Sequence, residues 1–249
     1  MNSNTNILET QVPISIHDPD DFFIVAYPKS GITWFQHLMS GIIYDVDLST
    51  IRFGEVNDLI PDVHYKSSYI RKISPMFFKS HSTPKPEYRN VIYIIRDGRD
   101  VTVSFFHHYL QKFPKDNVNY TKIINGYYAN STTWAKHVES WLENPFNANL
   151  LIIKYEHLLN NPINTLKKVC EFTKKQVTDK KLQTIVEVSS FNNLKQKEHS
   201  WGMDNPSWPQ QNTFFRKGVV GDYKNELPQK NLEQFLSLSQ NTLTKINYK

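Results

Sequence analysis

The chain has 249 residues, of which 39% are hydrophobic and 13% aromatic, and its formal net charge is +5. A single core can grow to about this size, so we expect one large domain. The only cysteine, Cys170, excludes an intrachain disulfide framework and a cysteine-rich metal site, and it favours a reducing compartment. No block rich in lysine and arginine marks a nucleic-acid tract, and no apolar run approaches the length of a membrane span. We therefore expect a cytoplasmic protein without a nucleic-acid or membrane partner.

Residues 1–20 are polar and lack the basic segment followed by an apolar segment that defines a secretory signal. We expect them to form a flexible lead into the first strand. No repeat and no linker-like change in composition divides the rest of the chain. Residues 21–249 are therefore predicted to form one domain.

The first structural signal is an apolar run at residues 22–26, followed by a turn that contains Pro28, Lys29, Ser30 and Gly31. An apolar segment with helical periodicity opens at Thr33, so the pattern predicts strand, loop and helix. The start of a helix presents free N–H groups and the positive end of its dipole, which attract anions. We therefore predict a phosphate or sulfate site. The loop is not a Walker A sequence, and by itself it is equally compatible with an ordinary turn of an α/β protein.

Further elements are predicted from apolar runs and helical periodicity. The strands are residues 76–81, 91–95 and 150–155. Residues 91–95 are uniformly apolar, as is typical of buried strands, and 150–155 is predicted to be another buried strand. The helices are residues 101–113 with Asp97 as N-cap, 119–130, 131–144, 162–173, 179–189 and 229–246. Residues 44–73 carry no clear pattern. Residues 192–215 are long, polar and aromatic, and they are predicted to form a lid or a binding loop.

The alternation of strands and helices predicts a single α/β domain with a central, mostly parallel β-sheet flanked by helices. Ligands of such sheets bind beyond the carboxyl ends of the strands. Several polar residues follow predicted strands and should surround one crevice, namely Lys29, Lys79, His81, Arg96 and Tyr155. With Arg216 and Lys217 they would gather several cations. Burying unpaired cations together is costly, so a ligand with more than one anionic group is expected there.

Four motifs, in chain order, resemble those of one family. Tyr27–Trp34 is similar to the 5′-phosphosulfate loop of the soluble sulfotransferases, and Lys79-Ser80-His81 to the segment that supplies their catalytic lysine and histidine. Arg96 with Ser104 resembles a pair that contacts the 3′-phosphate. Residues 216–225 resemble the second 3′-phosphate motif of that family. The resemblance covers most of the chain and suggests a soluble enzyme dependent on 3′-phosphoadenosine 5′-phosphosulfate (PAPS).

The resemblance implies transfer of a sulfuryl group from PAPS to a hydroxyl or amine of a small acceptor, with release of 3′-phosphoadenosine 5′-phosphate (PAP). It implies a P-loop-like phosphosulfate-binding loop, His81 as general base, and Lys29 and Lys79 as charge-stabilising catalytic residues. No metal is required. The residues that would bind PAPS are Lys29, Ser30, Gly31, Ile32, Thr33, Trp34, Arg96, Ser104, Tyr155, Ser189, Phe191, Phe214, Phe215, Arg216, Lys217 and Gly218.

Alternative interpretations accompany these roles. His81 could be a structural histidine, and Arg96 could form an ion pair with Asp97 or Asp100. The whole site could belong to a P-loop-type nucleotide kinase or to a catalytically inactive PAP-binding module. His107 and His108 are expected at the surface or in the pocket lining.

The chain also departs from the family pattern. Ile32 replaces a threonine of the loop, Tyr223 replaces a tryptophan, and Ser189 stands where threonine is usual. Pro228 and Gln229 occupy the usual dimer segment, so we expect a monomer or a dimer formed by another route. The acceptor pocket is expected to include Phe105, His108, Tyr109 and aromatic residues of 192–215.

Overall fold

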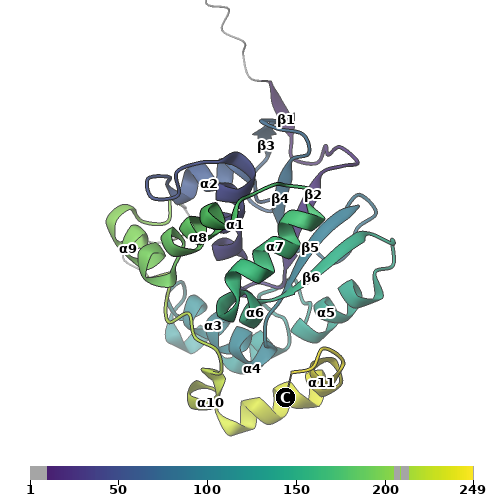
Figure 1. Ribbon diagram of the computed structural model, residues 1–249. Coiled ribbons are helices and arrows are strands. Elements are labelled where there is room, and N and C mark those ends of the chain that lie inside the picture. The colour runs from purple at the N-terminus through teal and green to yellow at the C-terminus, as the bar shows by residue number, and fades with distance from the viewer. Residues whose placement is uncertain (1–9, 205–207, 209–212, 249) are drawn as a thin grey trace, which may run out of the picture.

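Four parallel strands form the centre of the molecule (Figure 1). The computed structural model describes residues 10–204, 208 and 213–248. The strands are β2 (Phe22–Ala26), β4 (Phe77–Ser80), β5 (Asn90–Ile95) and β6 (Asn149–Lys154), in the order β4-β2-β5-β6. Each neighbouring pair is parallel, which confirms the predicted sheet type. All four strands therefore end at the same edge of the sheet.

The two central strands, β2 and β5, are almost completely buried. Every residue of β2 is buried, and so is every residue of β5 after Asn90, because both strands have neighbours on two sides. The prediction that 150–155 is a buried strand is wrong. β6 is an edge strand, and Ile152 remains 41% exposed although it lies in an apolar run. Composition alone does not distinguish the edge from the centre here.

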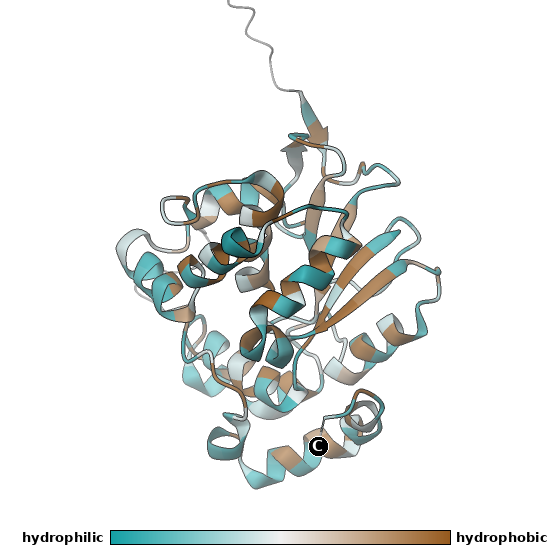
Figure 2. Cartoon of the chain, in the orientation of Figure 1, coloured by the Kyte–Doolittle hydropathy of each residue, from teal (hydrophilic) through white to brown (hydrophobic). Residues whose placement is uncertain are grey.

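Helices cover both faces of the sheet, with apolar sides turned inward (Figure 2). Ile24 of β2 packs toward one face and Phe23 toward the other, as the alternation of a strand requires. The first face is covered by α1 (Ile32–Tyr44), α6 (Tyr155–Asn160), α7 (Pro162–Phe172) and α8 (Asp179–Val188). The second face is covered by α3 (Gly98–Leu110), α4 (Tyr120–Ile124), α5 (Trp134–Glu143) and α11 (Gln229–Lys245).

Most predicted helices are present near their predicted bounds. α3 begins at Gly98, three residues before the predicted start, and Asp97 caps it by accepting the N–H of Arg99 at 2.9 Å. The predicted helix 119–130 is wrong in length, because α4 ends at Ile124 and Gly126 adopts a φ of 75°.

Two regions hold structure that the sequence did not reveal. Within 44–73 lie α2 (Phe53–Leu59) and β3 (Ser68–Ile70), and β3 pairs with β1 (Gln11–Pro13) in a small antiparallel sheet. β1 falls in the segment expected to be a lead, whose residues 1–9 lie outside the described chain. The loop predicted at 192–215 is wrong in its first part, which continues α9 (Phe191–Trp201). Residues 205–207 and 209–212 of that loop lie outside the described residues. The short elements η1 (Lys115–Asn117) and α10 (Tyr223–Glu226) complete the chain.

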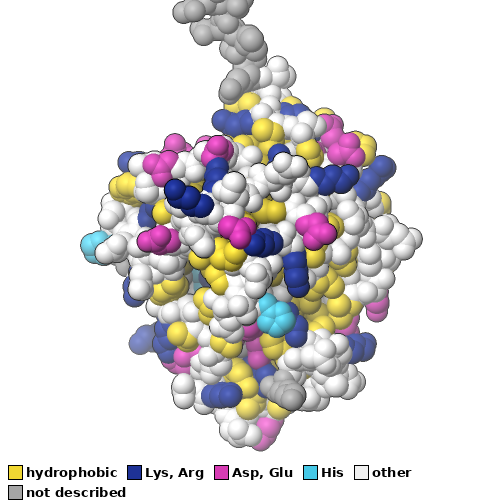
Figure 3. Space-filling view, in the orientation of Figure 1, with side chains coloured by type: hydrophobic (Ala, Val, Ile, Leu, Met, Phe, Trp, Pro, Cys, Tyr) yellow, Lys and Arg dark blue, Asp and Glu magenta, His cyan; other side chains and the backbone are white. Residues whose placement is uncertain are grey.

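The surface carries charges of both signs. On the face shown in Figure 3, lysine and arginine side chains are interspersed with aspartate and glutamate and form no continuous basic patch. Within the described ranges, no helix is both long enough and apolar enough to cross a bilayer.

Candidate active site

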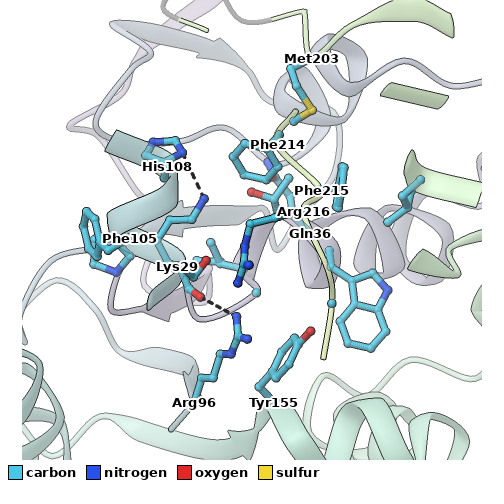
Figure 4. A pocket seen from close by; sticks show the side chains of 18 of the residues that line it. Lys29, Gln36, Arg96, Phe105, His108, Tyr155, Met203, Phe214, Phe215 and Arg216 are labelled. Carbon is cyan, nitrogen blue, oxygen red and sulfur yellow. Dashed lines mark hydrogen bonds between the residues drawn. The ribbon is translucent and has the colours of Figure 1, made fainter. Parts of the chain in front are cut away.

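A cavity lies beyond the carboxyl ends of the parallel strands, where loops and helix starts meet (Figure 4). It collects every residue expected at the strand ends, from Lys29 after β2 to Tyr155 after β6. Of the predicted site residues, only Ser30 and Ser189 do not line it. The predicted residues that do are Lys29, Gly31, Ile32, Thr33, Trp34, Lys79, His81, Arg96, Ser104, Tyr155, Phe191, Phe214, Phe215, Arg216, Lys217 and Gly218.

The loop between β2 and α1 has an unusual backbone. Lys29 has a φ of 70° and Gly31 a φ of 90°, both in the left-handed region. A non-glycine residue in that region is typical of functional sites, where surrounding structure holds the strained conformation. A Cβ atom at Gly31 would overlap the ring of Tyr155, so only glycine fits there. The loop thus brings the first N–H groups of α1 to the cavity.

Two serines of the predicted site have other positions. The N–H of Ser30 donates to the carbonyl of Tyr27 at 3.2 Å, so this amide is engaged in the turn. The Ser30 hydroxyl is buried and has no partner among the described residues. Ser189 is fully buried; its hydroxyl bonds Nδ1 of His37 at 3.0 Å and its carbonyl accepts the indole N–H of Trp34 at 2.9 Å. Ser189 therefore fixes Trp34 and does not line the cavity itself.

Lys29 points into the cavity between α3 and the 213–218 segment (Figure 4). Its ammonium nitrogen lies 3.3 Å from Nδ1 of His108 and 4.2 Å from the ring centre of Phe214. Burial is the largest cause that lowers the pKa of Lys29 to about 7, and the nearby charges of Arg96 and Lys112 contribute to the same shift. An anion in the cavity would reverse this effect.

Arg96 is held by backbone carbonyls. Its guanidinium donates to the carbonyls of Lys29 and Val219, each at 3.2 Å, and lies 4.5 Å from the ring centre of Tyr155. Asp97, offered above as its ion-pair partner, pairs with Arg99 at 2.7 Å. Nε of Arg96 is buried without a partner in the described structure.

Arg216 and Lys217 reach the cavity from the segment before α10. The expectation that they are unpaired is wrong, because both contact Asp222 and Glu226. Lys217 donates to Asp222 at 2.8 Å and to Glu226 at 2.5 Å. Gly218 follows with a φ of 65°, and a Cβ atom there would overlap the ring of Phe191. The pair is thus oriented by two carboxylates of its own segment.

Lys79 and His81 come from the end of β4. The ammonium nitrogen of Lys79 lies 3.1 Å from Oδ2 of Asp62, which is only 3% exposed. Nδ1 of His81 is 2.7 Å from the carbonyl of Ala26, and because a carbonyl only accepts, this nitrogen carries the proton. Nε2 therefore has a free lone pair. The backbone N–H of His81 donates to Nε2 of His64 at 2.9 Å.

The pKa of His81 is lowered to about 3. Burial is the largest cause, the Lys79 charge adds to it, and the Asp62 charge opposes it. His81 is therefore neutral at neutral pH. The cavity thus offers an unprotonated nitrogen beside a lysine, which suits proton acceptance next to developing negative charge.

Other lining residues were predicted less completely. Phe105, His108 and Tyr109 line the cavity as expected, together with Trp208 from the 192–215 region. His107 lies elsewhere and contacts Glu226 at 3.2 Å. Residues that were not predicted include Tyr65, Lys112 and Tyr128 of the lining, and Asp62 and His64, which contact Lys79 and His81. Lys112 alone had a usable signal, since it follows Ser104 and His108 at intervals of four residues in a predicted helix.

Comparison with known proteins identifies the family. Residues 19–247 match the sulfotransferase domain family. The chain belongs to the sulfotransferase family. Similar proteins include an amine sulfotransferase of Oryctolagus cuniculus, with 30% identity over 92% of this chain and 82% of that protein. Sulfotransferase 1B1 of Mus musculus is 29% identical over 87% of this chain and 80% of that protein. Membership confirms the predicted activity, sulfuryl transfer from PAPS.

Solved structures confirm the fold of this sulfotransferase. A retinol dehydratase in complex with androsterone and PAP superposes with a TM-score of 0.70, at 20% identity, over 92% of this chain and 82% of that one. A mouse sulfotransferase complexed with PAP superposes with a TM-score of 0.64, at 24% identity, over 91% of this chain and 85% of that one. Among the described residues of the sulfotransferase, no group of three or more acidic, histidine or cysteine side chains is arranged to hold a metal ion.

Proposed function

We propose that this sulfotransferase transfers the sulfuryl group to a hydroxyl or amine of a small-molecule acceptor, with His81 as the general base. The observation that carries the proposal is the hydrogen bond from Nδ1 of His81 to the carbonyl of Ala26 at 2.7 Å. It fixes the tautomer whose Nε2 accepts a proton. His81 and Lys79 line the same cavity as the loop between β2 and α1, here called the phosphate-type loop, so acceptor and donor would meet there.

The charge and shape of the cavity support PAPS as donor. PAPS supplies the activated sulfuryl group. Nε of Arg96, a residue that lines the cavity, is buried without a partner in the described chain, and an anionic oxygen suits its positive charge. The loop amides, Thr33 and Lys29 would hold the 5′-phosphate end. The 3′-phosphate would contact Arg96, Ser104, Arg216, Lys217 and Gly218.

Aromatic residues beside the loop suit the nucleoside. The indole of Trp34 is fixed by Ser189 and lies edge-on to Tyr155, with ring centres 5.7 Å apart. Phe191 and Phe215 are also edge-on, at 6.2 Å. Flat apolar faces of this kind favour stacking of a purine. We therefore assign the adenine site to these rings, with Phe214 at its border with Lys29.

Proton transfer follows from the placement of His81. The acceptor hydroxyl would donate to Nε2, and His81 would become positively charged as the acceptor oxygen attacks sulfur. Lys79 and the protonated His81 would then be two adjacent cations. The negative charge of Asp62, whose Oδ2 lies 3.1 Å from the Lys79 nitrogen, offsets their repulsion. Lys79 would stabilise charge on the transferring group, and Lys29 the departing phosphate oxygen.

Replacement of His81 tests the base. We expect His81→Ala to lower turnover by at least about a hundredfold, since general-base catalysis typically contributes that much, with little change in PAP affinity. The assay is transfer from labelled PAPS across phenols, alcohols, amines and sterols, and calorimetry measures PAP binding. His199→Ala is the matched control, because His199 is exposed on α9. Wild-type turnover in His81→Ala would exclude His81 as the base.

Replacement of Arg216 tests the 3′-phosphate assignment. Arg216→Ala should weaken PAP binding by about tenfold or more, because charge-assisted bonds to phosphate are strong. The fold should persist, as judged by circular dichroism. Arg89→Ala, at an exposed position before β5, is the control. Unchanged PAP affinity in Arg216→Ala would refute the assignment.

Two competing functions make different predictions. A P-loop-type kinase would bind ATP–Mg²⁺ better than PAP in a thermal-shift assay, and the match to the sulfotransferase family disfavours it. An inactive PAP-binding module would bind PAP without transferring labelled sulfate. We further propose a cytoplasmic location and a monomer, or a dimer that does not use the segment at Pro228, to be tested by cell fractionation and sedimentation.

A further inference from the structure

One face of α3 runs along the cavity from the proposed 3′-phosphate site to the opposite end. Ser104, His108 and Lys112 follow one another at four-residue intervals, and all three line the cavity. The N–H of Lys112 donates to the carbonyl of Tyr109 at 3.0 Å, so the helical turn extends to it. At about 1.5 Å per residue, Lys112 lies about 12 Å along the axis from Ser104. His108, beside Lys29, is half-way between them.

This order places Lys112 beyond the reaction centre. If Ser104 contacts the 3′-phosphate and Lys29 the bridging phosphate oxygen, the acceptor occupies the next part of the cavity. Lys112 is therefore on the acceptor side. The other lysines and arginines of the described lining are already assigned to the nucleotide or to the transferring group, namely Lys29, Lys79, Arg96, Arg216 and Lys217.

Lys112 carries a charge that the described protein does not neutralise. Its ammonium group lies 5.3 Å from the ring centre of Trp208, and it has no carboxylate partner among the described residues. Burial lowers the pKa of Lys112. A partly buried ammonium that lies over a ring and has no carboxylate partner in the described chain gains from an anionic ligand.

The described lining of the cavity also holds no acidic group that would attract a cation. Within the part of the chain that the structure describes, no aspartate or glutamate lines it. Acids that contact lining residues or their neighbours are engaged. Asp62 pairs with Lys79, Glu198 accepts two backbone N–H groups, and Asp222 and Glu226 pair with Arg216 and Lys217. Residues 205–212, which flank Trp208, contain no acidic residue in the sequence.

The walls on this side are flat rings. Tyr109 stacks on Tyr128 with ring centres 4.1 Å apart and on Phe105 at 5.3 Å. Trp208 stacks on His108 at 4.6 Å. Such walls suit a planar aromatic acceptor.

We propose that Lys112 selects aromatic hydroxyl acceptors that carry a carboxylate, by pairing with it, and disfavours acceptors with an ammonium group. This inference rests on the proposed function, and it sets this sulfotransferase apart from the similar protein named an amine sulfotransferase. In the reaction the acceptor O–H bond breaks and its proton passes to His81. An oxygen–sulfur bond forms as the bond between sulfur and the 5′-phosphate oxygen breaks, and PAP leaves.

Three phenols of similar size, differing in charge, test the selection. They are para-hydroxyphenylacetate, tyramine and the neutral para-propylphenol. We expect kcat/KM for the acid to exceed that for tyramine by about tenfold or more, as one partly buried charge pair allows. Binding of the three phenols to the PAP complex, measured by calorimetry, should give the same ranking without requiring turnover.

Variants assign the preference to Lys112. Lys112→Gln should lower the acid-to-neutral ratio of kcat/KM by about tenfold, and Lys112→Glu should invert the ranking toward tyramine. Lys115 is exposed in η1, and Lys115→Gln should leave the acid-to-neutral and acid-to-tyramine ratios of kcat/KM unchanged. A merely structural role of Lys112 would not invert a charge preference.

The outcomes separate this inference from the proposed function. The selection by Lys112 would be overturned if wild type and Lys112→Gln gave equal acid-to-neutral ratios of kcat/KM. It would also be overturned if the acid did not bind the PAP complex better than tyramine. The proposed function is measured apart from it, by PAP affinity and by turnover of the neutral phenol.

Discussion

The ammonium nitrogen of Lys29 lies 3.3 Å from Nδ1 of His108. Two basic groups so close together cannot both be charged without strong repulsion, so Lys29 donates and His108 accepts. The pKa of His108 is lowered to about 2, mainly by burial and then by the Lys29 charge, and that of Lys29 to about 7. Near neutral pH the proton population of Lys29 therefore responds to any anion that enters the cavity.

PAP binding should take up protons at pH 7 to 8. In the free protein Lys29 is partly deprotonated there, and the bound phosphate raises its pKa toward the ordinary value, so a proton is gained. PAP affinity should therefore rise as pH falls from 8 through 7. Calorimetry in buffers with different ionisation enthalpies measures the uptake. Lys29→Arg keeps the charge at all these pH values and should abolish the uptake; undiminished uptake in that variant would assign it to another group.

Glu226 should compete with the 3′-phosphate. Its carboxylate accepts from Lys217 at 2.5 Å and lies 3.6 Å from Arg216, the residues assigned to that phosphate. Glu226→Gln removes the negative charge and should tighten PAP binding by about threefold, as is typical of a partly exposed ion pair. Isothermal titration at low salt provides the measurement. Glu233→Gln on α11 is the control, since Glu233 bonds only Gln229 among the described residues. Equal affinities for Glu226→Gln and wild type would argue against competition.

The strand ends and the anion loop could be predicted from sequence because each depends on local patterns. The apolar run 91–95 and the turn 27–31 carry their own signals, and parallel topology brings their ends together. Asp62 and His64 could not be placed in this way. Asp62 reaches Lys79 because an isolated parallel bridge joins the two residues, a tertiary contact with no periodicity in the sequence.

α9 was missed for a different reason. Its buried face consists of Leu194, Lys197 and Glu198, at helical spacing but mostly charged. Lys197 donates to carbonyls before α2, at 2.9 Å in the case of Ile51, and Glu198 accepts the N–H of Phe215 at 2.9 Å. Charged side chains that bond the backbone replace apolar packing, so the helix shows no hydrophobic stripe.

Buried histidines should make the fold sensitive to acid. The pKa values of His37 and His137 are lowered to about 3 and about 4, in both cases chiefly by burial. Between pH 6.5 and these values the unfolded chain binds more protons than the native one, so the free energy of unfolding falls as pH falls. Each group contributes up to about 1.4 kcal/mol per pH unit. Urea unfolding at pH 7 and pH 5 measures the change.

A variant isolates the contribution of one histidine. His137 accepts the Tyr93 hydroxyl on Nδ1 at 2.8 Å and donates from Nε2 to the carbonyl of His81 at 3.1 Å. His137→Gln should reduce the loss of unfolding free energy between pH 7 and pH 5, whatever its overall stability. His199→Gln, at an exposed position, should not. If His137→Gln lost as much unfolding free energy between pH 7 and pH 5 as the wild type, His137 would not contribute to the acid sensitivity of the fold.

Gly31 should be indispensable for the shape of the phosphate-type loop. Both Gly31 and Gly202 have positive φ, 90° and 72°, so alanine at either position adds backbone strain. Only at Gly31 would the new Cβ overlap a neighbour, the ring of Tyr155, whereas nothing lies within 4 Å at Gly202. The overlap with Tyr155 should therefore add about 1–3 kcal/mol to the cost of Gly31→Ala beyond its backbone strain, and Gly31→Ala, unlike Gly202→Ala, should weaken PAP binding. Urea denaturation and calorimetry compare the two. Similar losses in both variants would show that backbone strain alone, and not the contact with Tyr155, requires glycine at position 31.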